Sequence, residues 1–220
     1  MSNGTMIIKR DGTKEHLNIE KIHKVVMHAC EGLAGVSASQ IEMNANIQFY
    51  DGMATSEIQE VLIRSANDLI NLEAPNYQYA AARLLSYGIY KEVFGGFEQK
   101  SFKDMIDLNI ERGVYDSSIK DYYTQDEIDK LDSYIHHKRD ENFTYAGLRQ
   151  VVDKYLVQDR SSGEVFETPQ FMYMMIAATL FANYPKEDRM YYVRRYYDAT
   201  SLFKLNIPTP VMAGVRTPVR

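Results

Sequence analysis

The sequence has few of the features that would set the protein apart from ordinary globular chains. Its single cysteine, Cys30, excludes an internal disulfide framework and any CxxC metal site. No apolar run approaches 18 residues and no signal-peptide segment opens the chain, which indicates a cytoplasmic protein without a membrane span. The net charge of −5, with no broad basic stripe to offset it, argues against general binding to nucleic acid or to a membrane surface.

What is present fits a soluble globular protein. Hydrophobic residues make up 45% and charged residues 25% of the 220 positions, which is typical composition, and the length allows one large or two small domains. His136 and His137 are adjacent, so on a helix they point about 100° apart and cannot share a metal. The other histidines lack cysteine or carboxylate partners at ligand spacing. We therefore predict no metal site.

The first 95 residues predict a β-hairpin closed over four helices. Residues 6–8 and 13–17 read as two strands, and Asp11-Gly12 between them is typical of a two-residue type I′ turn. Asn18 then occupies an N-cap position before apolar residues of helical period. Further helices are predicted with caps at Ser37 and Thr55, followed by a fourth over residues 76–93.

The second half predicts more helices and one further hairpin. Helices are expected over residues 101–112, after Thr124, over 143–154 and 170–182, and from Pro185 onward. The helix over 170–182 is apolar on nearly every side, so we expect it to be central and buried. Residues 155–157 and 164–166 read as a second hairpin. The last stretch, 207–220, reads as an extended segment with no strand partner, so the chain looks cut there.

One stretch, residues 6–21, has the character of an anion site. It carries Lys9, Arg10, Lys14 and Lys21 and ends at a predicted helix N-terminus, where backbone N–H groups and the helix dipole favour a phosphate. The alternative is a solvated hairpin with ordinary surface charges, and composition alone does not decide between the two.

Five stretches resemble the N-terminal part of class I ribonucleotide reductase large subunits, in the family's order. The first, MIIKRDGTKEHLNIEK, resembles the opening of the ATP-cone, a small nucleotide-binding domain. The stretches are residues 6–21, 51–70 (DGMATSEIQEVLIRSANDLI), 74–85 (APNYQYAAARLL), 154–171 (KYLVQDRSSGEVFETPQF) and 207–220 (IPTPVMAGVRTPVR). The resemblance implies a mainly α (α+β) fold with an ATP-cone over 1–95, a helical N-terminal domain over 96–205, and the start of a catalytic barrel over 206–220.

The resemblance also implies an allosteric site for ATP as activator and dATP as inhibitor, with Mg²⁺. Triphosphate contacts would come from Lys9, Arg10 and Lys91, and Thr55 would hydrogen-bond the nucleotide. The base and ribose would be lined by consecutive residues of the hairpin and the following helix, namely Glu15, His16, Leu17, Asn18, Ile19, Glu20 and Lys21. Gln59 and Gly88 stand where relatives carry histidines, which leaves open the number of nucleotides bound and the preference between ATP and dATP.

By the same resemblance, Thr209 would contact the ribonucleoside diphosphate substrate. The family's thiyl-radical cysteine and redox cysteine pair are not matched by Cys30, so no catalytic residue is expected in this chain. Implied partners are the rest of the large subunit, on the same or a separate chain, a second large subunit, and a small radical-generating metal subunit. The alternatives are a stand-alone cone-type nucleotide sensor, disfavoured because its zinc ribbon would need CxxC motifs, and a helical interaction module without catalysis.

Overall fold

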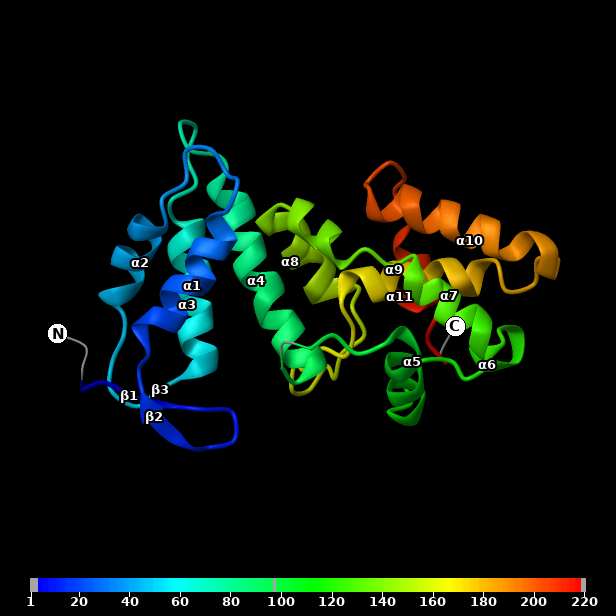
Figure 1. Ribbon diagram of the computed structural model, residues 1–220, viewed down its shortest axis with the longest axis horizontal. Helices are drawn as coiled ribbons and strands as arrows, with labels where there is room; N and C mark the ends of the chain where they lie inside the picture. Colours follow the sequence, from blue (N-terminus) through cyan, green and yellow to red (C-terminus); the bar gives the residue numbers. More distant parts are fainter. Residues whose placement is uncertain (1–3, 97, 219–220) are drawn as a thin grey trace. The chain divides into compact units, whose positions relative to one another are not determined.

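The computed structural model of the protein describes residues 4–96 and 98–218 (Figure 1). It divides into two compact units. The first comprises Met1–Gly88 with Glu141–Arg149, and the second comprises Ile89–Asp140 with Gln150–Arg220. The divisions fall inside helices, so the domain limits predicted from the sequence, 1–95, 96–205 and 206–220, stay a prediction. The described residues are mostly helical with one small sheet, which confirms the predicted fold class.

The sheet of the first unit has three strands in the order β2-β1-β3. Strands β1 (Met6–Ile8) and β2 (Lys14–His16) form the predicted antiparallel hairpin, with Ile8 opposite Lys14. The third strand, β3 (Met53–Ala54), pairs in parallel with β1. The sequence analysis missed β3, since a two-residue strand contains no detectable alternation.

The connection between β1 and β2 differs from the predicted two-residue turn. The backbone N–H of Lys9 donates to the carbonyl of Thr13, and that of Gly12 donates to the carbonyl of Lys9. Three residues therefore lie between the closing pair, and Gly12 takes a φ of 81°. The Asp11 carboxylate accepts hydrogen bonds from the N–H and hydroxyl of Thr13. This local bonding selects the three-residue loop with glycine in the left-handed position.

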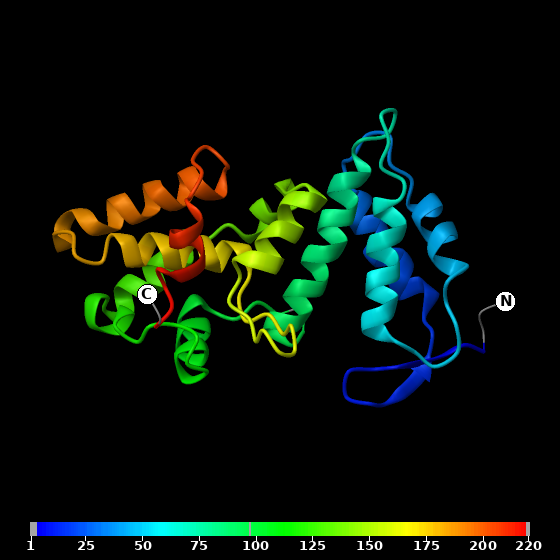
Figure 2. The same ribbon diagram turned by 180° about the vertical axis from the view of Figure 1, so that it is seen from behind.

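Four helices of the first unit lie side by side with the sheet at one end (Figures 1 and 2). Their facing sides are apolar and close a common core, in which Val26, Ile41 and Leu84 have no exposed surface. The four helices are α1 (Ile19–Cys30), α2 (Ala38–Asn46), α3 (Thr55–Asn67) and α4 (Tyr77–Phe94). Helix α4 continues into the second unit, and a further helix, α8 (Tyr145–Lys154), begins in the first unit and ends in the second.

Two predicted helix caps are confirmed in the first unit and one is displaced. Asn18 and Ser37 accept hydrogen bonds from the N–H groups three residues on. The N-cap of α3 is Ala54, not Thr55, and the Glu57 carboxylate accepts the N–H of Ala54 at 2.8 Å. Because β3 runs to Ala54, the helix begins directly after the strand and Thr55 becomes its first residue.

The second unit is built around α9 (Pro169–Leu180). Its residues from Pro169 to Ala178 are all buried, as its all-round apolar character predicted. Thr168 caps it by accepting the N–H of Phe171, and α10 (Lys186–Ser201) lies alongside it (Figures 1 and 2). The other elements are α5 (Phe102–Glu111), α6 (Ile119–Tyr122), α7 (Gln125–Ser133), the 3₁₀ turn η1 (His137–Asn142) and α11 (Thr209–Gly214).

One prediction for the second unit is confirmed in a shorter form and one is wrong. The second hairpin forms, since the N–H of Phe166 donates to the carbonyl of Val157 and that of Asp159 to the carbonyl of Glu164, but its strands are reduced to one isolated antiparallel bridge between Gln158 and Val165. The stretch after residue 207 is not extended throughout, since α11 forms there. Thr209 and Pro210 are its first residues, and the fixed φ of proline favours a helix start.

Candidate functional site

A side-chain cap fixes the start of α1 beside the hairpin. The Oδ1 atom of Asn18 accepts a hydrogen bond from the backbone N–H of Lys21 at 3.0 Å. The backbone N–H of Leu17 donates to the carbonyl of Thr5 at 2.9 Å, which ties the end of β2 to the strand before it. The other N–H groups of this first turn have no partner within the helix and point along its axis, where they can bind an anion.

Lys9 and Glu15 form an ion pair across the hairpin. Lys9 Nζ lies 2.7 Å from Glu15 Oε2, and both side chains are partly exposed. The hydrogen bond between them raises the pKa of Lys9 and lowers the pKa of Glu15, so both groups are charged at neutral pH. An exposed pair of this kind is weak, and an incoming polyphosphate can therefore displace the Glu15 carboxylate from the Lys9 ammonium.

The parallel pairing of β1 and β3 places Thr55 next to the basic end of β1. In the observed register Ile8 is opposite Ala54, and Lys9 and Thr55 each follow directly. The two residues therefore leave the sheet side by side, one as the start of the hairpin loop and the other as the first residue of α3. This arrangement brings together residues that are 46 positions apart in the sequence.

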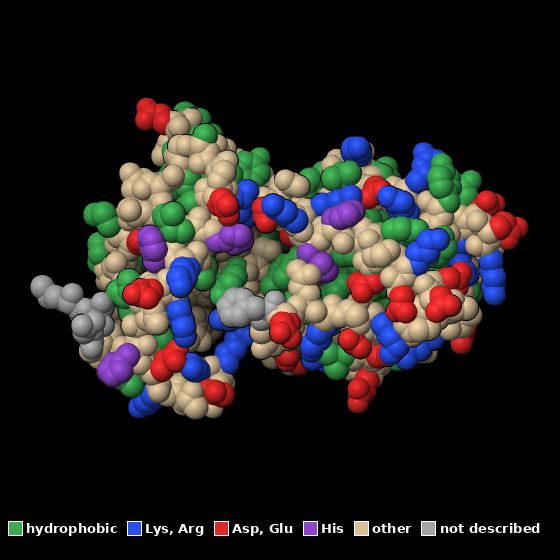
Figure 3. Space-filling model, in the orientation of Figure 1, with side chains coloured by type: hydrophobic (Ala, Val, Ile, Leu, Met, Phe, Trp, Pro, Cys, Tyr) green, Lys and Arg blue, Asp and Glu red, His purple; other side chains and the backbone are tan. Residues whose placement is uncertain are grey.

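The remaining predicted residues of the hairpin and α1 are accessible to a ligand. Arg10, His16, Ile19, Glu20 and Lys21 are exposed, and Ile19 shows 39% of its surface although it is apolar. Leu17 is buried beneath them. Between residues 6 and 21 four cations and three carboxylates give a net charge of +1 (4 − 3), in a chain whose net charge is −5. Charged side chains of both signs cover this end of the first unit (Figure 3).

Lys91 lies in the last turn of α4 and is half-buried. It belongs to the second unit, whereas the other predicted nucleotide contacts belong to the first. The expectation that Lys91 reaches the same triphosphate as Lys9 therefore stays a prediction.

Gln59 has a structural role between α3 and α4. Its side-chain amide donates to the carbonyl of Leu84 at 2.6 Å. A Cβ atom at Gly88 would lie 3.4 Å from Cγ of Gln59, a van der Waals contact, so the two positions are neighbours between α3 and α4. The two positions that depart from the family pattern thus fit each other within this chain.

Three residues that were not predicted as part of the site, Tyr50, Asp51 and Glu57, hold the start of β1 and the start of α3 in place. The Asp51 carboxylate accepts the backbone N–H of Met6 at 2.7 Å, and this bond holds the start of β1. The hydroxyl of Tyr50 donates to Glu57, whose carboxylate also caps α3. The Asp-Gly dipeptide at 51–52 is typical of a tight turn, but nothing in the sequence indicates that Asp51 bonds to a residue 45 positions away.

Thr209, the predicted substrate contact, is exposed at the start of α11. Its Oγ1 atom lies 3.1 Å from the hydroxyl oxygen of Tyr155. No other residue predicted to contact a ligand lies on this helix, so this potential site is separate from the hairpin in sequence.

A buried ion pair lies beneath α11. The guanidinium of Arg216 donates to the Glu167 carboxylate, and neither side chain has exposed surface. Two further groups donate hydrogen bonds to the same carboxylate. They are the hydroxyl of Tyr115, at 2.5 Å, and the backbone N–H of Val157, at 2.9 Å. Burial opposes the charge on Arg216, but the Glu167 carboxylate outweighs it and raises the pKa of the guanidinium. The guanidinium of Arg216 therefore stays charged, and its contact with Glu167 connects the end of α11 to the segment before α9.

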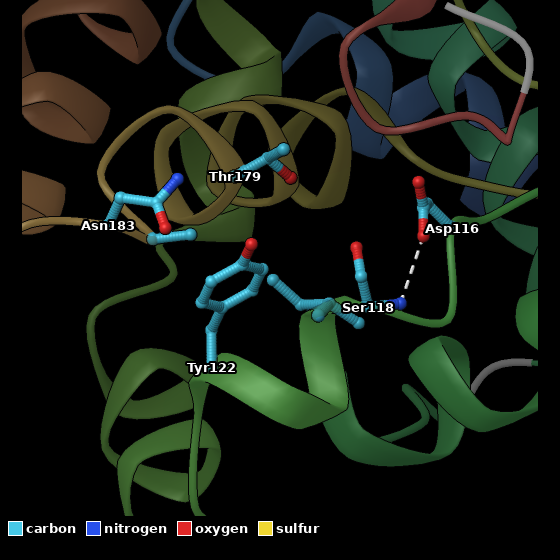
Figure 4. A pocket seen from close by; sticks show the side chains of 7 residues that line it. Asp116, Ser118, Tyr122, Thr179 and Asn183 are labelled. Carbon is cyan, nitrogen blue, oxygen red and sulfur yellow. Dashed lines mark hydrogen bonds between the residues drawn. The ribbon is translucent and has the colours of Figure 1, made fainter.

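A small cavity of about 40 Å³ lies between α6 and the end of α9 (Figure 4). Polar and apolar side chains both line it, namely Asp116, Ser118, Ile119, Tyr122, Thr179, Ala182 and Asn183. The Asp116 carboxylate accepts the N–H of Ser118 at 2.9 Å. The volume suits one or two water molecules and is far too small for a nucleotide. None of the predicted site residues lines it.

Among residues 4–96 and 98–218, no group of three or more histidine, cysteine, aspartate or glutamate side chains is placed to hold a metal ion. No helix within the same residues is long and apolar enough to cross a membrane.

Comparison with known proteins agrees with the geometry. Residues 5–92 match the family described as the ATP cone domain, and residues 141–220 match the all-alpha domain of ribonucleotide reductase. The whole chain is 48% identical to ribonucleoside-diphosphate reductase 1 subunit alpha of Escherichia coli and 48% identical to the subunit alpha of Haemophilus influenzae. The subunit alpha of Enterobacteria phage T4 is 42% identical over 97% of the chain.

The match covers only a part of these relatives. The chain spans 29% of the length of the two bacterial subunits and 28% of the phage subunit. Lys91 lies within the residues matched by the cone family, and Thr209 within those matched by the all-alpha domain. The chain therefore contains an ATP cone domain followed by the all-alpha domain of ribonucleotide reductase, and over its full length it is similar to the N-terminal region of the large subunits of that enzyme.

Proposed function

We propose that this chain is the nucleotide-binding regulatory part of a class I ribonucleoside-diphosphate reductase, with ATP as activator and dATP as inhibitor. The observation that carries the proposal is the exposed basic hairpin beside the capped start of α1, within residues that match the ATP cone domain. Such a turn offers unpaired N–H groups and a favourable dipole to phosphate oxygens.

Each residue of the proposed site has a chemical role. Lys9 and Arg10 bind the triphosphate through charge-assisted hydrogen bonds, and Lys91 adds a third cation. On binding, Lys9 exchanges the Glu15 carboxylate for a phosphate oxygen. The exposed side chain of Ile19 supplies an apolar wall for the base. The remaining contacts to base and ribose come from Glu15, His16, Leu17, Asn18, Glu20, Lys21 and Thr55.

Mg²⁺ accompanies the nucleotide in this proposal and is bound chiefly by phosphate oxygens, since this ion keeps most of its water and needs few protein ligands. Thr209 contacts the ribonucleoside diphosphate that the complete enzyme reduces. The partners are the remainder of the large subunit, a second large subunit, and a small subunit that generates the radical, all in the cytoplasm. The nucleotide acts by shifting how these subunits assemble, which couples two distant sites.

Titration of the chain with nucleotide tests this proposal directly. We expect ATP and dATP each to bind with micromolar affinity, on the order of −8 kcal/mol, and to raise the melting temperature because they bind only the folded state. Isothermal calorimetry measures the first and a thermal shift the second. Absence of both heat and stabilisation at millimolar nucleotide would contradict the proposal.

Removing the charge of Lys9 should weaken nucleotide binding without unfolding the protein. We expect Lys9→Ala to reduce the affinity for ATP by about tenfold or more, the usual consequence of losing a charge-assisted bond. Lys91→Ala should have a similar effect. The matched control is Lys24→Ala, which removes the same charge from α1 outside the proposed site and should leave the affinity almost unchanged. Equal affinities in all three variants would show that the phosphates lie elsewhere.

A further inference from the structure

The hydroxyl groups of Tyr155 and Thr209 meet at the surface of the second unit. Their oxygen atoms are 3.1 Å apart, a hydrogen-bond distance in which either group can be the donor. Thr209 is exposed and Tyr155 is half-exposed, so the pair lies where a ligand can reach it. The two residues are 54 positions apart, and local chain geometry therefore does not explain the contact.

The backbone of Tyr155 is fixed independently of this hydroxyl contact. Its carbonyl accepts a hydrogen bond from Nη2 of Arg216 at 2.7 Å, and Nη1 of the same guanidinium donates to the carbonyl of Met212 at 2.5 Å. Arg216 thus connects α11 to Tyr155, the residue whose hydroxyl contacts Thr209 at the start of that helix. Since Arg216 is itself held by buried Glu167, the backbone segments that carry the two hydroxyl groups are connected to each other through buried contacts.

We propose that Tyr155 is a positioning residue for the substrate site, and that its hydroxyl orients the hydroxyl of Thr209. This inference rests on the proposed contact between Thr209 and the ribonucleoside diphosphate. The phenol O–H donates to Oγ1 of Thr209, because a phenol is more acidic than an alcohol and is the better donor. The Thr209 O–H then turns outward as a donor to an oxygen of the diphosphate.

The benefit of this arrangement is preorganisation. A free threonine hydroxyl rotates among three staggered positions and also bonds to water. The hydrogen bond from Tyr155 occupies one side of Oγ1 and so favours the position in which the O–H points toward the ligand. Binding then loses less rotational freedom, which improves affinity without any contact between Tyr155 and the substrate.

The test uses the large subunit that contains this chain, assayed with its radical-generating partner. Tyr155→Phe keeps the ring and removes only the hydroxyl. We expect it to raise the KM for the ribonucleoside diphosphate by about 3- to 10-fold, the value of one hydrogen bond, with kcat nearly unchanged. Tyr191→Phe is the matched control, since it removes an exposed tyrosine hydroxyl that accepts a hydrogen bond from Arg195, and it should leave the KM unchanged.

A double-mutant cycle separates positioning from a general structural effect. In a Thr209→Ala background, Tyr155→Phe should have no further effect on the KM, because the group that it orients is gone. In a Thr209→Ser background, which keeps the hydroxyl, the effect should return. Unchanged melting temperatures exclude loss of folding as the cause.

The outcomes distinguish this inference from the function on which it rests. If Thr209→Ala leaves the KM unaltered, Thr209 is not a substrate contact and the proposed role of that residue is overturned, together with the role of Tyr155. If Thr209→Ala raises the KM but Tyr155→Phe does not, only the positioning role is overturned. An equal effect of Tyr155→Phe with and without the Thr209 hydroxyl would also overturn it.

Discussion

Replacing Arg216 by methionine is expected to lower the free energy of unfolding of the second unit by about 3–5 kcal/mol, the usual cost of removing one partner from a buried ion pair. The Arg216 side chain has no exposed surface, and neither has Glu167. Methionine fills much of the same volume but leaves the carboxylate buried without a counter-charge. The hydrogen bonds from Tyr115 and Val157 remain and offset only part of this cost.

Urea denaturation measures the loss, and hydrogen exchange shows where it occurs. Protection of the amides in α11 should fall first, because Arg216 connects this helix to Tyr155 and Glu167. The matched control is Arg194→Met, whose exposed guanidinium lies 4.0 Å from Asp198 and should contribute less than about 1 kcal/mol. The double variant Arg216→Met with Glu167→Met removes both charges and should recover most of the stability. A double variant as unstable as the single one would contradict this explanation.

Local signals in the sequence predict much of the proposed nucleotide site. The hairpin, the cap at Asn18 and the face of α1 each depend on residues a few positions apart, so turn and capping rules suffice. The pairing of β1 with β3 connects Ile8 with Ala54, and no short pattern predicts it. The ion pair between Lys9 and Glu15 was missed for a different reason, since composition shows charges but not their partners.

In the second unit, contacts between residues far apart in the sequence were again the ones that could not be predicted. The apolar pattern of α9 predicted its burial correctly, because a helix that is apolar on every side has no face for solvent. The burial of Arg216 and Glu167 could not be predicted, since charged residues are almost never fully buried unless they are paired. Their pairing spans 49 positions. It depends on α11, which the sequence analysis took for an extended segment.

The buried carboxyl group of Asp140, in the second unit, is expected to make the free energy of unfolding strongly dependent on pH. Asp140, in η1, is 2% exposed and accepts hydrogen bonds from the hydroxyl of Tyr90 at 2.9 Å and from the amide of Gln170 at 2.7 Å. Burial raises the pKa of Asp140 to about 7, although both hydrogen bonds oppose the shift. The folded protein therefore holds a proton on this group that the unfolded chain loses near pH 4.

The sign of the pH dependence follows from this difference. Stability from the protonated form of Asp140 is fully present below about pH 4 and is lost as the pH rises through 7, by up to about 4 kcal/mol for a shift of about three units. His137 has the opposite dependence, because burial lowers its pKa to about 4 and the folded state loses stability as the pH falls from about 6.5. The two effects oppose each other between pH 4 and 6.5, so the wild-type curve alone is not diagnostic.

Comparison of the wild type with Asp140→Asn isolates the carboxylate, since His137 contributes equally to both proteins. Asparagine keeps the shape and one acceptor for Tyr90, but it does not ionise. Relative to the wild type, the variant should become more stable with each step in pH from 4 to 7, because over this range the unfolded wild-type chain has released a proton that the folded protein still holds, and the difference should level off above pH 7. Urea denaturation at several pH values measures the difference in unfolding free energy. A difference that does not change with pH would show that Asp140 is ionised throughout and that its two hydrogen bonds outweigh its burial.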